Sequence, residues 1–389
     1  MAPKQKYTAA DAPPPRSFSE RELAARKIVG VNTETVTDIT STDFPGHWPS
    51  EDHAWNKQRF AENLQVQFHQ NEPLLSSFSL IGIDASVANA FRRILIAEIP
   101  TLAIEYCFVK NNTSVIQDEV LCARLGLVPF KGGKEGLLDF MKWFQKPEEE
   151  TPEEERHLGS FDHNTIQLTL KIECTRNKDA APGETDPRKV YHNAHVYAKD
   201  IEFKPFGRQL EYFSGENTIK SPNPDILIAK MRPGQVIDID MHAIKGIGRD
   251  HAKFSPVATA SYRLLPVIDI TQPILGKDAK KFKRCFPDGV IGIEKVTAKE
   301  AKIKGSGYEG HEGEDKAVVV DAMRDTVSRE CLRHEEFQGK VKLGRVRDHF
   351  IFSIESLGQW DSDELFLESI KTLRTKCEAF KTSLQNMTK

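Results

Sequence analysis

The C-terminal segment of the chain carries apolar side chains at alternating intervals of four and three residues. This average repeat of 3.5 residues is typical of a helix that packs lengthwise against another helix. No glycine or proline interrupts residues 361–386, and Asp361 with Glu364 predicts the helix start, so we expect one helix of about 25 residues, or about 38 Å. The members of this apolar stripe are Phe366, Ile370, Leu373, Cys377, Phe380 and Leu384.

A second amphipathic helix is predicted near the front of the chain, within Asn89–Glu105. Asp84 stands at the N-cap position and Pro100 ends the helix. Two arginines interrupt its apolar residues, so they either point to solvent or meet acceptors on another chain. A guanidinium is suited to paired hydrogen bonds at an interface, and we favour the second interpretation. The candidate interface residues in this helix are Phe91, Arg92, Arg93, Ile94 and Leu95.

The composition excludes several classes of function. The net charge of −3 gives no electrostatic basis for gripping nucleic acid. No stretch of residues is long and apolar enough for a membrane span, and the polar, proline-rich N-terminus has no signal core, which favours a reducing compartment. The six cysteines form no C-x2-C pair, so we expect all six to be buried apolar residues and predict no metal site.

Two segments alternate apolar and polar residues as half-buried strands do. They are Ile166–Cys174 and Ile237–Ala243. In the second strand Asp238, Asp240 and His242 share one face, where they could be read as metal ligands. Residues two apart on a strand always share a face, so we interpret the three as its solvent side.

Two further motifs have the residue types of a catalytic or cofactor site. Gly305, Gly307 and Gly310 fit G-x-G-x-x-G, but charged residues flank the motif where a dinucleotide site needs a strand and a helix. Arg249-Asp250-His251 contains an acid and a base, yet no G-x-S-x-G nucleophile motif accompanies it. We therefore predict structural loops in both places, and a solvated acidic loop at 147–155.

Three strings in the chain resemble signatures of the RNA polymerase alpha-subunit family. NAFRRILIAEIPTLAIE (Asn89–Glu105) is similar to the first helix of that family, which forms half of its dimer contact. DEVLCARLGLVPF (Asp118–Phe130) and HAKFSPVATASYRLLP (His251–Pro266) resemble two further signatures. The resemblance extends over nearly everything from residue 28 onward, and it is greatest to the eukaryotic alpha-like subunits that RNA polymerases I and III share.

The resemblance implies an α+β fold with a discontinuous dimerisation module. A β-rich domain is inserted into this module, and a degenerate ferredoxin-like domain follows. Relatives can hold an iron–sulfur cluster there, but counting back from Cys285 reaches Lys281, Asp278 and Leu275, which cannot bind one. The expected segments are a disordered tail at 1–27, the dimerisation module at 28–101, 251–267 and 345–389, the inserted domain at 102–250 and the ferredoxin-like domain at 268–344.

The resemblance also implies a non-catalytic subunit with no cofactor. Such a subunit forms a heterodimer with a smaller alpha-like subunit and then docks the large catalytic subunits of polymerases I and III in the nucleus, including the nucleolus. The alternatives are an alpha-like subunit of polymerase II or of the archaeal enzyme, a nucleotide-dependent enzyme built on the 305–310 glycines, and a nucleic-acid-binding module built on the lysines around 277–304.

Overall fold

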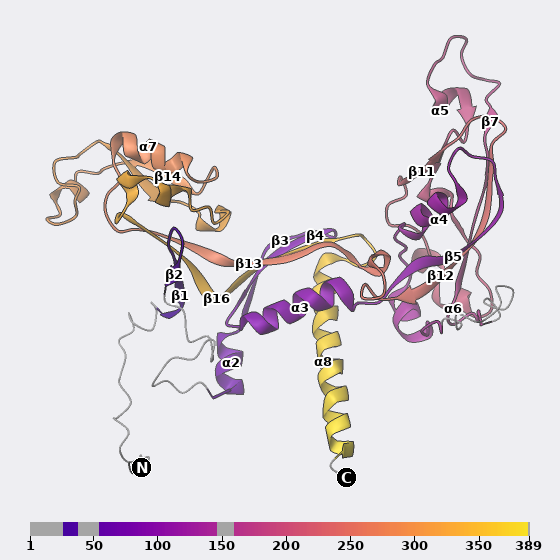
Figure 1. Ribbon diagram of the computed structural model, residues 1–389, viewed down its shortest axis with the longest axis horizontal. Coiled ribbons are helices and arrows are strands. Elements are labelled where there is room, and N and C mark those ends of the chain that lie inside the picture. Colours follow the sequence, from indigo (N-terminus) through magenta and orange to yellow (C-terminus); the bar gives the residue numbers. More distant parts are fainter. Residues whose placement is uncertain (1–25, 38–53, 146–158, 388–389) are drawn as a thin grey trace, which may run out of the picture. The chain divides into compact units, whose positions relative to one another are not determined.

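The computed structural model describes residues 26–37, 54–145 and 159–387 (Figure 1). The expected tail at 1–27 falls almost entirely outside these residues, as does the acidic loop at 147–155. The described chain divides into two compact units. The first unit takes the described residues of 1–67, 79–85 and 262–351, and the second those of 68–78, 86–261 and 352–389.

The fold mixes α-helices with antiparallel sheets. One six-stranded sheet has the order β2-β1-β16-β4-β3, with β13 also paired to β16. Its strands are β1 (Ile28–Val31), β2 (Val36–Thr37), β3 (Gln65–Asn71), β4 (Leu75–Ile81), β13 (Val257–Ile270) and β16 (Val341–Ser356). A four-stranded sheet has the order β10-β6-β12-β5. Its strands are β5 (Thr101–Asn112), β6 (Ile166–Glu173), β10 (Glu202–Phe203) and β12 (Val236–Gly246).

Shorter strand pairs, seven α-helices and several short 3-10 or π turns complete the described chain. The pairs are β7 (Thr175–Arg176) with β8 (Tyr191–His192), β9 (His195–Tyr197) with β11 (Leu227–Lys230), and β14 (Ile291–Lys295) with β15 (Asp315–Val319). The α-helices are α2 (Lys57–Asn63), α3 (Ala85–Ala97), α4 (Asp118–Gly126), α5 (Pro187–Val190), α6 (Gln209–Tyr212), α7 (Gly276–Arg284) and α8 (Ser362–Met387). None of these helices is both long enough and apolar enough to cross a bilayer.

The alternating strands predicted from sequence form the centre of the four-stranded sheet. β12 pairs antiparallel with β5 on one side and β6 on the other. Ile237, Ile239 and Met241 are fully buried on one face of β12. The aspartates of the other face are held by lysines, since Lys110 Nζ lies 2.5 Å from an Asp240 oxygen and Lys171 Nζ lies 3.5 Å from an Asp238 oxygen.

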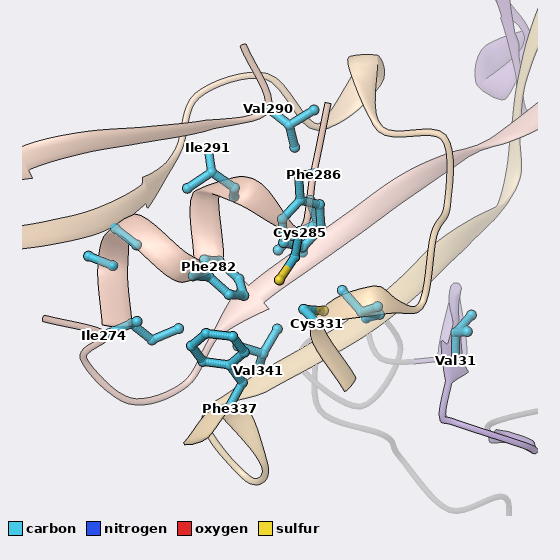
Figure 2. Close-up of a cluster of buried hydrophobic side chains, with 14 residues drawn as sticks. Val31, Ile274, Phe282, Cys285, Phe286, Val290, Ile291, Cys331, Phe337 and Val341 are labelled. Carbon is cyan, nitrogen blue, oxygen red and sulfur yellow. The ribbon is translucent and has the colours of Figure 1, made fainter. Parts of the chain in front are cut away.

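The core of the first unit is an apolar cluster beneath α7. Figure 2 shows Phe282 of α7 beside Phe286 and Phe337, with ring centroids 5.0 and 5.1 Å away. Cys285 and Cys331 lie in the same cluster rather than at its surface. Burial raises the pKa of the Cys331 thiol to about 12, so this group stays protonated at neutral pH.

The expectation that all six cysteines are buried is wrong in part. Cys174, Cys285 and Cys331 are buried, whereas Cys107 and Cys122 are half-buried. Cys377 is exposed. It belongs to the apolar stripe of α8, and a helix leaves such a stripe in solvent wherever its own chain does not cover it.

Replacing the central ring of the first unit gives a test of this core. Phe282→Ala removes a fully buried side chain and leaves a cavity, so we expect the free energy of unfolding of this unit to fall by about 3–5 kcal/mol. Lys283→Ala, one residue further on the exposed face of the same helix, should change it by less than about 0.5 kcal/mol. Urea unfolding measures both, and equal midpoints for the two variants would contradict the assignment of this core.

Candidate partner interface

Helix α3 is anchored at its C-terminal end within the second unit. Its C-terminus lies against the loop that follows β12, because Arg249 N donates a hydrogen bond to Ala97 O at 2.9 Å. Gly248 permits this approach, since a Cβ there would lie only 2.2 Å from Ile96 O. The Gly-x-Gly that precedes Arg249 is therefore explained by backbone packing.

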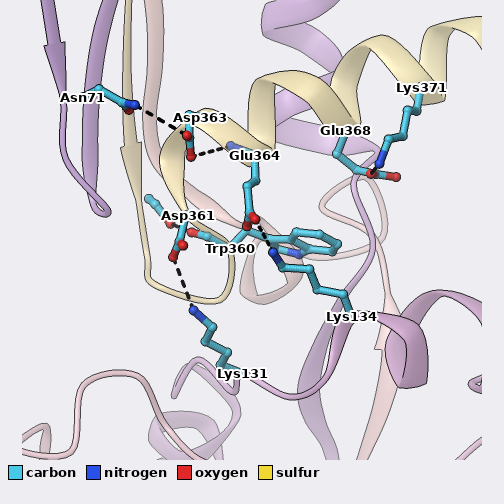
Figure 3. A network of polar contacts seen from close by, with 10 residues as sticks. Asn71, Lys131, Lys134, Trp360, Asp361, Asp363, Glu364, Glu368 and Lys371 are labelled. Atoms are coloured by element: carbon cyan, nitrogen blue, oxygen red, sulfur yellow. Dashed lines mark hydrogen bonds and ion pairs between the residues drawn. The ribbon is translucent and has the colours of Figure 1, made fainter. Parts of the chain in front are cut away.

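The first turns of α8 are anchored by a network of polar contacts. Ser362 donates two hydrogen bonds to backbone carbonyls just before β4. Its N lies 2.9 Å from Pro73 O and its Oγ 2.7 Å from Glu72 O. Figure 3 shows two lysines from the loop after α4 at this helix start, Lys131 facing Asp361 at 3.3 Å and Lys134 paired with Glu364. Carboxylates in the first turn of a helix interact favourably with the positive end of the helix dipole. Together with these contacts, they fix where α8 begins.

Phe366 joins α8 to three other segments of the second unit. Its ring centroid lies 4.6 Å from that of Phe78 in β4 and 5.4 Å from that of Phe91 in α3, in an edge-on contact. Phe352 of β16 stacks on Phe78 at 5.4 Å, and its ring centroid lies 6.3 Å from that of Phe366. Aromatic pairs with these separations contribute about 0.5–1.5 kcal/mol each beyond the burial of their area.

An ion pair joins the same two helices further along. Lys376 Nζ lies 2.8 Å from both carboxylate oxygens of Glu98, one residue beyond the end of α3. The pair is partly exposed, so it adds about 0.2–1 kcal/mol. Together with the Phe91–Phe366 contact, it makes α3 and α8 one continuous surface, although more than 250 residues separate them in sequence.

The structure divides the eleven predicted interface residues into three groups. Ile94, Leu95 and Phe366 are buried in the core of their own chain. Phe91, Arg92 and Leu373 are half-buried. Those that remain exposed are Arg93, Ile370, Cys377, Phe380 and Leu384.

The exposed part of α8 includes two large apolar residues besides the predicted stripe, Leu367 and Met387. Beyond Ser369, no described residue of the helix is buried. Phe380 is 67% exposed and Met387 83%. Met387 continues the repeat three residues after Leu384, so its position could have been predicted; Leu367, 57% exposed beside the stripe, has no such periodic signal.

The two arginines of α3 have different environments. Arg92 donates from its guanidinium to Asn89 Oδ1 at 3.1 and 2.8 Å, one turn earlier on the same helix. Arg93 is exposed. The Arg92 guanidinium is therefore already hydrogen-bonded within its own helix, whereas the Arg93 side chain projects into solvent.

The remaining motifs have structural roles in the described chain. Gly305, Gly307 and Gly310 all have φ between +73° and +82°, in an exposed loop between a 3-10 turn (Glu300–Lys302) and β15. His251 caps the short turn Ala252–Phe254, its Nδ1 accepting from Lys253 N at 3.1 Å. Among the residues that the structure describes, no group of three or more His, Cys, Asp or Glu is arranged to hold a metal.

A hollow of about 530 Å³ in the second unit contains two thiols and an ion pair. Lys253 Nζ lies 2.6 Å from a Glu105 oxygen and donates to Ile104 O at 2.7 Å. Cys107 and Cys122 lie on its wall, and burial raises the pKa of Cys107 to about 12. The lysine charge is neutralised and the Cys107 thiol stays protonated, so the hollow offers neither a free cation nor a reactive thiolate there.

Thiol labelling at neutral pH tests these environments. We expect a maleimide to react with Cys377 at least about tenfold faster than with Cys285 or Cys331, because only Cys377 is exposed. Cys377→Ser should remove the fast phase, and all six thiols should react readily in urea. Rapid labelling of Cys331 in the folded chain would contradict its burial.

A known protein family matches the chain from β4 into α8. The family model described as the RNA polymerase Rpb3/Rpb11 dimerisation domain matches residues 77–377, which include α3 and most of α8. The DNA-directed RNA polymerases I and III subunit RPAC1 of Saccharomyces cerevisiae is 49% identical over 354 residues, covering 91% of this chain and 97% of the relative.

Two further relatives show how the identity differs between polymerase classes. RPAC1 of Homo sapiens is 43% identical over 365 residues, covering 94% of this chain and 96% of the relative. The DNA-directed RNA polymerase II subunit rpb3 of Dictyostelium discoideum is 28% identical over 316 residues, covering 80% of this chain and 91% of the relative. The chain is thus more similar to the subunits named for polymerases I and III than to this polymerase II subunit.

Proposed function

Since this chain belongs to the RNA polymerase Rpb3/Rpb11 dimerisation family, we propose that it is a non-catalytic subunit shared by DNA-directed RNA polymerases I and III. The observation that carries the proposal is 43–49% identity over more than nine tenths of the chain to subunits named for those two enzymes. Polymerases of these two classes transcribe ribosomal, 5S and transfer RNA, so the chain acts in the nucleus, including the nucleolus.

We further propose that the surface formed by α3 and α8 binds a smaller alpha-like subunit. Two observations support it: the family match to a dimerisation domain includes α3 and α8 as far as Cys377, and the stripe beyond Ser369 is exposed except for the half-buried Leu373. Large exposed apolar side chains in series on one helix are typical of a protein–protein interface. Arg92 and Arg93 lie at its margin, and the heterodimer then docks the large catalytic subunits.

The finer architecture is also part of the proposal. The sheet β10-β6-β12-β5 belongs to a β-rich domain inserted at 102–250, and residues 268–344 form a degenerate ferredoxin-like domain. Cys285 and Cys331 are buried among apolar side chains, which supports a domain without an iron–sulfur cluster. Lys281, where a ligand would be needed, is paired with Glu336 at 2.6 Å.

Tagged chain purified from its own cells tests the function. We expect mass spectrometry to detect subunits specific to polymerase I and to polymerase III, and none specific to polymerase II. Co-purification of the polymerase II enzyme in equal amount would contradict the assignment to the other two.

Substitution in the exposed stripe tests the interface. Phe380→Asp with Leu384→Asp places two charges where apolar contacts form, and we expect the affinity for the smaller subunit to fall at least about a hundredfold. Leu210→Asp, at a residue 59% exposed on α6, is the matched control and should bind normally. Both variants should melt as the natural chain does, and normal binding by the double variant would refute the interface.

Elemental analysis tests the metal-free domain. The purified heterodimer should contain iron and zinc far below one atom per chain, because the thiols of the first unit are buried, protonated and too few to hold a cluster. A stoichiometric amount of either metal that Cys285→Ser removes would contradict this.

A further inference from the structure

The two flanks of the apolar stripe on α8 differ in what they face. On one flank, at intervals of seven residues, lie Ser369, Lys376 and Ser383. Ser369 is fully buried and Lys376 is bound to Glu98, so this flank is turned toward α3. The other flank is therefore the one that a further helix packed on the stripe would meet.

That second flank carries Leu367, Arg374 and Lys381, again seven residues apart. The Arg374 side chain is 78% exposed. It forms an ion pair with Glu378 one turn away, with Arg374 Nε 2.8 Å from Glu378 Oε1. Lys381 is exposed, and no described carboxylate lies within ion-pair distance of it. An exposed pair within one helix is weak and easily exchanged, so both cations are available to a second chain.

The charges along this half of α8 are one-sided. Between Ile370 and Met387 the chain has four basic side chains and one acidic one. Flanking positions of a helical seam set the choice and orientation of the partner through charge. In a parallel pair of two copies the flank of Arg374 and Lys381 would face Lys376, and in an antiparallel pair it would face itself. Both arrangements place like charges together, and in the parallel one Glu98 offsets part of the Lys376 charge.

We propose that the partner helix seated on α8 carries acidic side chains about one heptad apart, facing Arg374 and Lys381, and that this pairing selects it over a second copy of the chain. The spacing corresponds to about 10 Å along the helix axis, since each residue advances 1.5 Å. The inference rests on the proposed function, because it requires that the smaller subunit binds this helix. It adds the charge pattern that the partner must have.

Charge reversal on the intact chain tests the pairing. The association rate with the smaller alpha-like subunit is measured by stopped flow at several salt concentrations. Lys381→Glu should slow association about tenfold at low salt, and Arg374→Glu with Lys381→Glu more, with the difference shrinking as salt rises. Lys381→Arg should keep the natural rate.

The matched control is Lys371→Glu, the same change on the same helix at a position off both flanks. It should alter the rate less than twofold. Equal slowing by Lys371→Glu, or no effect of Lys381→Glu, would overturn the specific pairing while leaving the interface intact. Failure of the natural chain to bind the smaller subunit at all would instead refute the proposed function, and a stable dimer of the natural chain alone would refute the selection against a second copy.

Discussion

The packing of Phe366 against Phe78, Phe91 and Phe352 is the contact on which the second unit depends. It joins a strand, a helix, a second strand and the C-terminal helix at one point. Because the ring is buried, the first turns of α8 cannot leave the core without opening a large cavity. The rest of α8 therefore projects from a fixed base, and its exposed stripe is presented in a defined direction.

The elements of this fold were more predictable than their contacts. The terminal helix was expected over 361–386 and is observed over Ser362–Met387, and both alternating strands lie where expected. These segments have a regular apolar period, and periodicity reports local conformation directly. The division of the described chain into two units depends on which distant strands pair, and that information is spread over the whole sequence.

The candidate interface shows the same limit at the level of single residues. The apolar period predicts one face of α8, but it does not separate Phe366, which is covered by its own chain, from Phe380, which is not. Both residues are equally apolar in sequence. The prediction that all cysteines are buried failed for the same reason. Residue type favoured burial for Cys377, but Ser369 is the last residue of α8 that its own chain buries, so Cys377 is exposed.

If α8 binds the smaller subunit as proposed, its exposed end ties the lifetime of the chain in the cell to the supply of that subunit. A polypeptide synthesised in excess would display Phe380 and Met387 to every protein it meets, and such side chains are what chaperones and quality-control proteases recognise. Removal of the unpaired chain would then match its amount to that of the smaller subunit. A helix longer than its own core can cover would thus help to keep the two subunits in equal amounts.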